Sequence, residues 1–281
     1  MLTITLDWLA CTFKEYNHET ENFIRTYASA PTVQESPARN GYTRATMDSN
    51  GVSVLWNPDY SSMGHHAVFS GSSLRNLFTS GVVSPSTLLR ACVDAGGSVS
   101  RLDLAKDFTE GEVDYEAVYQ SLEQRAGGGN ARTVTKLQSS GGGFTIYIGS
   151  RQSERFVRLY DKAAEQKLPD ALWSRLEIET KGMVARAVAT SILKSGDWSG
   201  TFDALVLGMV GDAKKSNIGM FFSTGPIPVG LPKIERHTDR ERWISGQVIP
   251  AVAKHFIDNP TSEAVARLRA TLDLIDKQRK I

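Results

Sequence analysis

The sequence predicts an α+β fold, in which two similar antiparallel-sheet halves are followed by a helical C-terminal region. Three observations predict this class. Segments such as TVTKLQ, FTIYIG and RFVRLY alternate with period 2 and are rich in β-branched and aromatic residues, which is typical of strands. The same order of elements occurs twice along the chain. Beyond residue 183 the apolar residues take a helical spacing, so helices are expected there.

The internal repeat begins at two strands that resemble each other. TLDWLACTF at 5–13 and SRLDLAKDF at 100–108 both place Leu-Asp early in an apolar run and end on Phe. Each is followed by a predicted helix and three predicted strands. The predicted sheet domain therefore covers residues 1–185, with a weak repeat of 1–95 in 96–185. Chance similarity between two short strands is an equally good explanation.

The elements of each half follow from local patterns. In the first half a helix is expected around 18–29, then strands in GYTRATMDS, GVSVLWN and GHHAVFSG. In the second half a helix is expected at 114–126, then strands in ARTVTKLQS, GFTIYIGS and RFVRLYDK. The glycine clusters at 127–129 and 141–143 predict turns. A last strand, WSRLEIETKG at 173–182, has one charged side that faces solvent or a site.

The C-terminal region, residues 186–281, is expected to be helical and packed on the sheet domain. A Gly/Pro-rich connector, STGPIPVGLPK, precedes the last helices. The final segment starts with a capping-box-like Thr-Ser-Glu and has a basic end, which suits the dipole of a helix.

Composition limits the classes of function. With 281 residues, 41% of them hydrophobic, the chain can bury the core of one large or two medium domains. A net charge of +1 excludes a strongly basic, histone-like binder, so a polyanion would have to meet a local patch. Between Arg125 and Lys162 there are seven basic residues and two acidic ones. This segment favours a phosphate-facing surface, although solvated strand edges also carry cations.

The cellular compartment is inferred from cysteine usage and hydropathy. The two cysteines, Cys11 and Cys92, lack zinc-site spacing, so neither a disulfide framework nor a structural zinc is predicted. The N-terminus does not resemble a signal peptide, and the sequence has no apolar run long enough to span a membrane. We therefore expect a cytoplasmic protein without a membrane partner.

Acidic residues on the predicted strands form a candidate metal site. Asp103 and Asp107 lie four residues apart on a strand, hence on one face, and Glu177 lies on the charged face of another. Oxygen ligands suit magnesium or manganese, and His66 is a candidate nitrogen ligand. The alternative is that neighbouring arginines simply pair with these acids across strands. A lone strand histidine is also more often a satisfied polar group.

Two tyrosines on the predicted hairpin lie close to cations. A phenol ionises near pH ~10, so a tyrosine that attacks a phosphate needs positive charge nearby. Arg158 and Lys162 flank Tyr160 on one predicted strand face, which would supply that charge. Tyr147 is the competing nucleophile. In the alternative interpretation both are aromatic side chains of a half-buried hairpin.

Five segments, in this order, resemble the replication initiation factor family: DWLACTF, GHHAVFSGSSLR, SRLDLAKDF, FTIYIGSRQSERFVRLYDKAAEQ and LWSRLEIETKG. The resemblance spans about residues 5–185. It is sharpest in Tyr-Ile-Gly-Ser-Arg-x-Ser at 147–153, Arg-x-Tyr-Asp-Lys at 158–162 and Arg-x-Glu-x-Glu at 175–179. The family comprises rolling-circle initiators of plasmids and filamentous phages and related conjugative relaxases. The resemblance therefore implies sheet halves of a ferredoxin-like or relaxase-like type.

The resemblance also implies an activity. Such a protein nicks one strand at a double-strand origin by metal-assisted tyrosine attack, keeps the 5′ end as a phosphotyrosine and later rejoins the strand. Its partners would be double-stranded origin DNA, single-stranded DNA and a host helicase or polymerase; whether it forms a homodimer is left open. The implied catalytic residues are Tyr160, Lys162 and Arg175, and the implied ligands of Mg or Mn are Asp103, Asp107, Glu177 and His66. The implied DNA-binding residues are Arg151, Arg155, Arg158, Lys136 and Tyr147.

One departure from the family pattern keeps two other functions open. Some plasmid members have a tyrosine just before the arginine that matches Arg175, whereas this chain has Ser174. Either Tyr160 is the nucleophile, or the protein is a non-catalytic origin-binding or regulatory protein that kept the fold. A metal nuclease that uses water would need the acids but not Tyr160.

Overall fold

A computed structural model describes residues 4–29, 33–79, 81, 83–140, 143–168, 170–222 and 249–278. The chain forms two compact units, Met1–Ile234 and Glu235–Ile281. In the second unit the described residues form α9 (Ile249–Asp258) and α10 (Glu263–Gln278), where helices are expected from the sequence. The predicted connector STGPIPVGLPK lies outside the described residues. Within the described ranges, no helix has both the length and the apolar character that a bilayer span requires.

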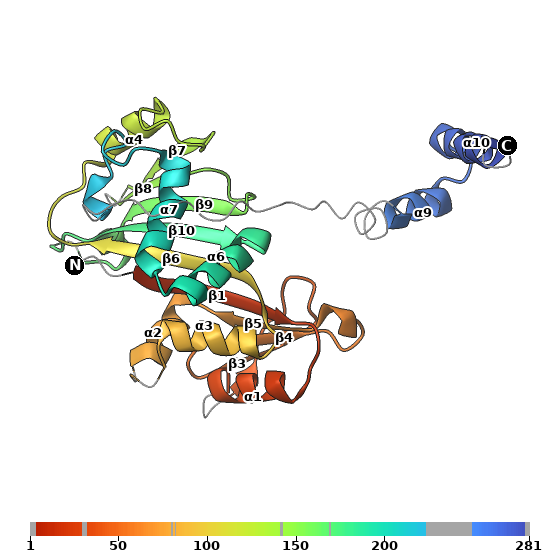
Figure 1. Ribbon diagram of the computed structural model, residues 1–281, viewed down its shortest axis with the longest axis horizontal. Coiled ribbons are helices and arrows are strands. Elements are labelled where there is room, and N and C mark those ends of the chain that lie inside the picture. The colour runs from red at the N-terminus through yellow and green to blue at the C-terminus, as the bar shows by residue number, and fades with distance from the viewer. Residues whose placement is uncertain are drawn as a thin grey trace. The chain divides into compact units, whose positions relative to one another are not determined.

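The first unit is built on one antiparallel sheet whose described strands have the order β2-β3-β4-β5-β1-β6-β10-β9-β8-β7 (Figure 1). The strands are β1 (Ile4–Phe13), β2 (Val33–Glu35), β3 (Arg44–Asp48), β4 (Ser53–Trp56), β5 (His65–Phe69), β6 (Ser98–Phe108), β7 (Val134–Gln138), β8 (Phe144–Ile148), β9 (Arg155–Asp161) and β10 (Ser174–Lys181). The predicted α+β class is confirmed.

The sheet consists of two similar halves that meet at its centre, where β1 pairs with β6. Outward from this pair, β5, β4, β3 and β2 follow on one side and β10, β9, β8 and β7 on the other. Each half is therefore a strand, a helix and four strands, where the sequence predicts three strands after the helix. The prediction missed β2, which has only three residues. As a result, the predicted repeat matches the strands of the two halves one position out of step. In the structure β10 of the second half corresponds to β5 of the first half.

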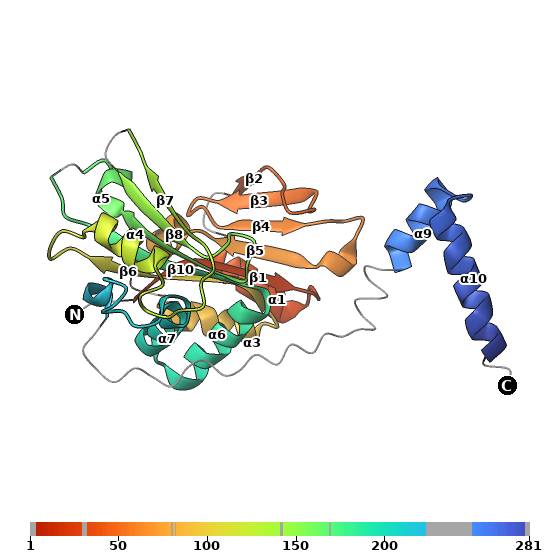
Figure 2. The same cartoon turned by 90° about the horizontal axis from the view of Figure 1, so that it is seen from above.

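Seven described helices and two 3-10 turns complete this unit. They are α1 (His18–Tyr27), α2 (Gly71–Thr79), α3 (Pro85–Asp94), α4 (Tyr115–Glu123), α5 (Lys162–Glu165), α6 (Gly182–Ser195), α7 (Trp198–Val210), η1 (Ser61–Met63) and η2 (Gly219–Phe221). Figure 2 shows α1, α3, α6 and α7 on one side of the sheet, and α6 and α7 both contact β10. The domain boundary expected at residue 185 stays a prediction.

Helix boundaries follow from capping residues. Asn17, Ser84, Asp114 and Asp197 each accept a hydrogen bond from a backbone N–H in the first turn of α1, α3, α4 and α7. Such side chains satisfy N–H groups that have no partner within the helix. Gly196 ends α6 at a φ of 68°, a left-handed conformation that glycine adopts without a steric penalty.

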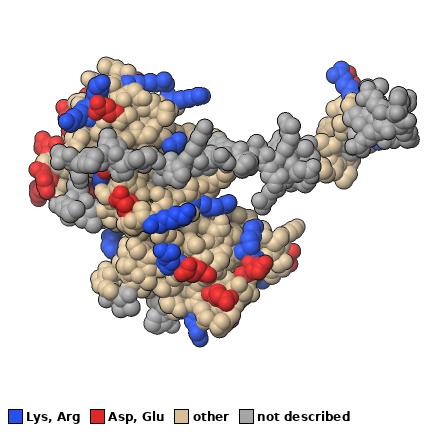
Figure 3. Space-filling model, in the orientation of Figure 1, with Lys and Arg blue, Asp and Glu red and all other residues tan. Residues whose placement is uncertain are grey.

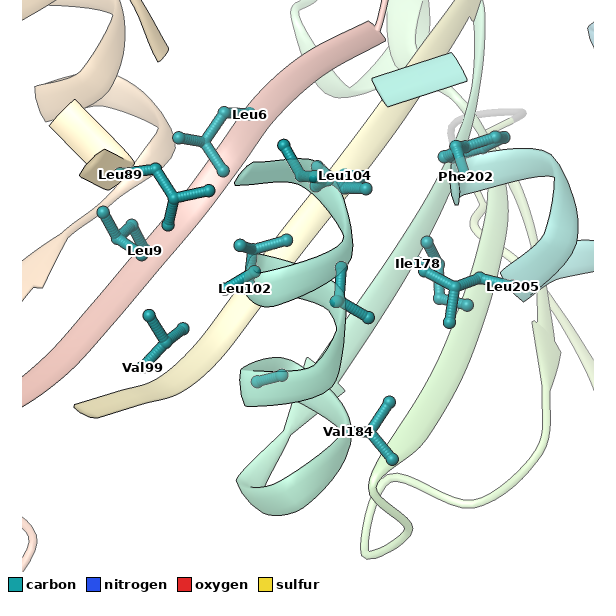
Figure 4. Close-up of a cluster of buried hydrophobic side chains, with 14 of the residues drawn as sticks. Leu6, Leu9, Leu89, Val99, Leu102, Leu104, Ile178, Val184, Phe202 and Leu205 are labelled. Carbon is teal, nitrogen blue, oxygen red and sulfur yellow. The ribbon is translucent and has the colours of Figure 1, made fainter. Parts of the chain in front are cut away.

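The hydrophobic core lies between the sheet and this helix layer. Leu9, Leu102 and Ile178 of the strands meet Leu89 and Phe202 of the helices (Figure 4). Because successive strand residues point to opposite faces, the residues between these apolar ones point away from the helices. We call the face opposite the helix layer the charged face. On the helix side, basic and acidic side chains are interspersed (Figure 3).

Lys106 places a buried cation on the helix side of the sheet. The side chain of Lys106 is fully buried, and its Nζ donates to Asp203 Oδ1 of α7 at 2.5 Å. The same Nζ lies 5.0 Å from the ring centroid of Phe202. A buried lysine has to be paired in this way, because an unpaired charge in the core is very costly. The pair therefore ties α7 to β6.

Candidate functional site

Strand register brings acids of β6 and β10 together on the charged face. Glu177 pairs with Ala105, whereas Asp107 pairs with Arg175 in the same antiparallel ladder. Glu177 therefore lies diagonally between Asp103 and Asp107, over the small side chain of Ala105. This neighbourhood of acids from two strands is what the sequence leads us to expect for a catalytic site.

Asp7 belongs to the same cluster and was missed by the sequence analysis. It lies where the pairing of β1 with β6 shifts register, between Leu6 and Trp8. Arg175 Nη1 donates to Asp7 Oδ1 at 2.8 Å. The sequence carries a signal for it, because TLDWL repeats the Leu-Asp of SRLDL, but the predicted ligands include Asp103 and Asp107 of the second copy and not Asp7 of the first.

Arg175 joins the outer acids of the cluster. Its Nε and Nη2 donate to the two carboxylate oxygens of Asp107 at 2.7 and 2.8 Å, and its remaining Nη1 reaches Asp7. The Arg175 side chain is 6% exposed. Trp173 Nε1 also donates to Asp107 Oδ1 at 2.7 Å. One guanidinium therefore connects β10, β6 and β1.

The other acids of the charged face also accept from arginines. Arg101 bonds Asp103 in a bidentate manner and reaches Glu179 at 2.8 Å. Arg158 bonds Glu177. The interpretation in which arginines pair with these acids therefore describes the arrangement, across strands for Asp107 and Glu177 and within β6 for Asp103. Removing one member of such a buried pair is costly, since the other charge is left unpaired.

Asp103 is the most strongly perturbed of these acids. Burial raises its pKa to about 7, although Arg101 acts in the opposite direction; Glu177 and Glu179 raise it further. The folded protein therefore holds a proton on Asp103 at pH values where the unfolded chain has released it, above ~4. As a result, the free energy of unfolding from this group decreases as the pH rises through that window.

We expect Asp103→Asn to remove this pH dependence. Between pH ~4 and 7, the free energy of unfolding of the wild type should decrease relative to that of the variant by up to ~1.4 kcal/mol per pH unit. Urea unfolding at several pH values measures the difference. Asp59→Asn, at an exposed position, is the control and should parallel the wild type. If the free energy of unfolding of Asp103→Asn runs parallel to that of the wild type across this pH range, the raised pKa of Asp103 is contradicted.

Tyr160 lies beside Glu177 on the charged face. Its side chain is buried, with 9% of the residue exposed, and its Oη donates to Glu177 Oε2 at 3.4 Å. Burial, and then the charge of Glu177, raise the pKa of Tyr160 above that of a free phenol. The phenol is therefore placed to give its proton to a carboxylate rather than to ionise freely.

The cations next to Tyr160 differ from the expected arrangement. The expectation puts Arg158, Tyr160 and Lys162 on one strand face, but β9 ends at Asp161 and Lys162 begins α5. Lys162 bonds Glu165, and its Nζ lies 5.5 Å from the ring centroid of Tyr160. Arg158 is engaged with Glu177 through Nη2, and its buried Nε has no hydrogen-bond partner among the described residues.

The residues expected to bind DNA are divided between the two faces. Tyr147 and Arg158 are cross-strand partners on the charged face, and Arg151 lies 4.9 Å from the Tyr147 ring centroid. Lys136 pairs with Ile146 on the helix side and donates to Glu116 of α4 at 2.7 Å. Arg155, three residues before Arg158 in the same strand, also points to the helix side. The five residues therefore do not form one surface.

His66 lies apart from the acids. It pairs with Thr12, four residues along β1 from Trp8, which faces Asp103. Its Nδ1 is 2.9 Å from Thr12 Oγ1, its ring stacks on Tyr42, and burial and Arg39 lower its pKa to about 4. Because β5 and β10 lie on opposite sides of the central pair of β1 and β6, His66 lies in the other half of the sheet from Glu177.

The acids have the donor chemistry for a divalent cation, but not the spacing. Asp7, Asp107 and Glu177 offer only oxygen, which magnesium and manganese prefer. However, each accepts from an arginine. Within the part of the chain that the structure describes, no group of three or more His, Cys, Asp or Glu residues is arranged to hold a metal ion. In this arrangement the arginines occupy the positions that a cation would take.

The fold is similar to that of a solved rolling-circle initiator. The structure is similar to that of a rolling circle replication initiator protein from Geobacillus stearothermophilus, with a TM-score of 0.65 and 21% identity, over 75% of this chain and 86% of that one. This likeness concerns the fold alone.

Sequence comparison supports the resemblance to the replication initiation factor family. Residues 97–215 of this chain match the model of the replication initiation factor family, which confirms the resemblance seen in its motifs. Over 124 residues it is also 30% identical to the putative DNA relaxase NicK of Bacillus subtilis, which covers 38% of this chain and 34% of the relative. The chain thus matches about a third of that relative's length. The family match begins just before β6 and does not include Asp7.

Proposed function

We propose that this protein is a rolling-circle DNA replication initiator that nicks one strand at a double-strand origin with Tyr160 as nucleophile and later rejoins it. The observation that supports this most directly is the contact of Tyr160 Oη with Glu177 Oε2 at 3.4 Å, beside the cluster of Arg175, Asp7 and Asp107. A nucleophile within reach of a base, next to fixed cations, is the arrangement required for attack on a phosphodiester.

In the proposed reaction Glu177 is the general base. Tyr160 Oη attacks phosphorus and transfers its proton to Glu177, whose pKa is raised by burial, so that the carboxylate is a stronger base than in water. The new bond joins Tyr160 Oη to the 5′ phosphate. The bond from phosphorus to the 3′ oxygen breaks, and that oxygen takes a proton from solvent. The reverse transesterification rejoins the strand.

Two arginines would stabilise the charge that develops on the phosphate. Arg158 lies across from Glu177 and Arg175 across from Tyr160 in the ladder of β9 and β10. Fixed cations near a transferring phosphoryl group are among the largest contributors to rate, and arginine binds phosphate oxygens in a bidentate manner. Because both guanidinium groups are already held by acids, they are oriented before DNA binds.

A divalent cation, Mg or Mn, is part of the proposal as a bound cofactor. Such a cation would supply further positive charge near the phosphate, but the described acids are not spaced to hold it in this arrangement, so no ligands are assigned to it. A host helicase or polymerase, single-stranded DNA and a second copy of the chain are further proposed partners.

A covalent-adduct assay tests the proposal. The protein is incubated with supercoiled DNA that carries the cognate origin, with manganese present, and then denatured. We expect a protein–DNA adduct that is lost in Tyr160→Phe and kept in Tyr147→Phe. An adduct that persists in Tyr160→Phe would exclude this nucleophile. Nicking without any adduct would indicate a water-using nuclease, and binding alone would indicate a non-catalytic origin-binding protein.

The position of Ser174 supports Tyr160 over the non-catalytic alternative. Ser174 Oγ is 2.6 Å from Tyr115 Oη of α4, and Ser174 is buried. The residue therefore points to the helix side, away from Glu177 and Arg175. A tyrosine at this strand position would also leave the charged face, so serine there removes no group from the proposed site.

Glu177→Gln is expected to slow adduct formation by about 10²–10⁴-fold, the usual contribution of a general base. The variant keeps the size of the side chain but cannot accept the phenolic proton. Single-turnover adduct formation measures the effect. Glu179→Gln is the matched control, because Glu179 lies two residues away on β10 and pairs with Arg101. An equal effect in both variants would point to a loss of charge rather than of a base.

A further inference from the structure

A groove of about 570 Å³ lies directly beside Tyr160. Its floor is formed by Thr145 and Tyr147 of β8 and by Arg158 and Tyr160 of β9, which are cross-strand partners. One wall is the end of the hairpin of β7 and β8, with Leu137, Gln138, Ser139, Gly143 and Phe144, and the other is the start of α5, with Asp161, Ala164 and Glu165. The volume lies within the range of roughly 300–1,000 Å³ typical of small-ligand sites.

We propose that this groove binds the base of the unpaired nucleotide next to the phosphate that Tyr160 attacks. The inference rests on the proposed function and adds a nucleotide-binding site to it. Tyr160 is shared by the groove and the reaction, so a nucleotide whose phosphate lies at Tyr160 Oη has its base within reach of the groove floor.

The lining has the chemistry of a base site. The ring of Tyr147 is held in place by Phe156, at 5.5 Å between ring centroids, and by Arg151, at 4.9 Å. A ring that is already fixed loses little freedom when a base stacks on it. Leu137, on the wall formed by the hairpin of β7 and β8, is 54% exposed, although its side chain is large and apolar. Contact with the flat face of a base would cover it.

The charges favour the base over the backbone as the occupant. Asp161 and Glu165 line the α5 wall, where they would repel a phosphate. Arg158 lies on the groove floor at its β10 side, and Arg175 lies beyond it, across from Tyr160 in the ladder of β9 and β10. A DNA strand suits both the acids and the arginines if its phosphate lies over Arg158 and Arg175. Its base then lies between Tyr147 and the α5 wall. Aromatic stacking of this kind tolerates every base, because each has a π face.

Equilibrium binding without a divalent metal tests this site. Fluorescence anisotropy in EDTA compares a labelled dT 12-mer with an abasic 12-mer of the same length. We expect the wild type to bind the dT 12-mer about 5- to 150-fold more tightly, as stacking of one base would give. Tyr147→Ala should bind the two probes equally, and Tyr147→Phe, which keeps the ring, should retain the difference.

The control is Tyr119→Ala, at a tyrosine of α4 that contacts Lys136 on the helix side; it should bind as the wild type does. The proposal is overturned if the wild type binds both probes equally, or if Tyr147→Ala keeps the preference. The adduct assay separates this result from the proposed function. Adduct formation together with an unchanged preference in Tyr147→Ala would refute only the groove. A preference lost in Tyr147→Ala without any adduct in the wild type would refute only the nicking.

Discussion

Lys106→Ala is expected to lower the free energy of unfolding by about 3–5 kcal/mol, because it leaves the carboxylate of Asp203 without its cation at the boundary between β6 and α7. Lys106 is fully buried and bonds Asp203 at 2.5 Å. Its ammonium group also lies 5.0 Å from the ring of Phe202, so the alanine variant loses packing as well. Urea unfolding followed by circular dichroism measures the change.

The double variant Lys106→Met, Asp203→Leu separates the contribution of the ion pair to stability from that of the packing. Replacing a buried ion pair by apolar residues of similar volume is often neutral or stabilising, so this variant should regain most of the loss. If Lys106→Ala costs less than about 1 kcal/mol, as is usual for an exposed pair, the pair does not tie α7 to the sheet. If the proposed function holds, nicking activity should persist in the double variant, since Lys106 points away from the charged face.

Arg175→Ala is expected to have the second large effect. It removes the group that holds Asp7 and Asp107 at 2.8 and 2.7 Å, and two carboxylates would then face each other without a cation. We expect a loss of about 3–5 kcal/mol in the free energy of unfolding. If the proposed function holds, the adduct should form about 10²–10³-fold more slowly, as for the loss of one donor to a developing charge.

Arg175→Lys is the informative companion. Lysine keeps the positive charge but lacks the planar fork that bonds two carboxylates in different directions. Compared with Arg175→Ala, Arg175→Lys should therefore regain more of the free energy of unfolding than of the rate of adduct formation. Single-turnover adduct formation and urea unfolding on the same preparations give both quantities. Full recovery of the rate by lysine would mean that Arg175 acts by charge alone.

The strands and helices of this protein were largely predictable, because their signals are local. Period-2 alternation predicted β8, β9 and β10, and the segment expected to be helical at 18–29 contains α1, which begins after Asn17. The three-residue strand β2 was missed because so short a segment carries almost no pattern of its own. Sheet pairing alone defines it.

The candidate site was predictable only in part. Alternation correctly assigned Asp103 and Glu177 to faces of their strands. Asp7 was not assigned, since its place depends on a register shift in β1. Lys136 and His66 were grouped with the site from sequence proximity and residue type. The sheet places the first on the helix side and the second beyond the central strand pair.

The sequence by itself determined the class of fold, the family motifs and which side chains share a strand face, because these depend on residues close together in the chain. Only the tertiary structure decided which acid meets which arginine and that Tyr160 lies beside Glu177. Arg175 and Asp7 are 168 residues apart in sequence. Their contact exists because β10, β6 and β1 pair in one register, and alternation along a single strand carries no information about register.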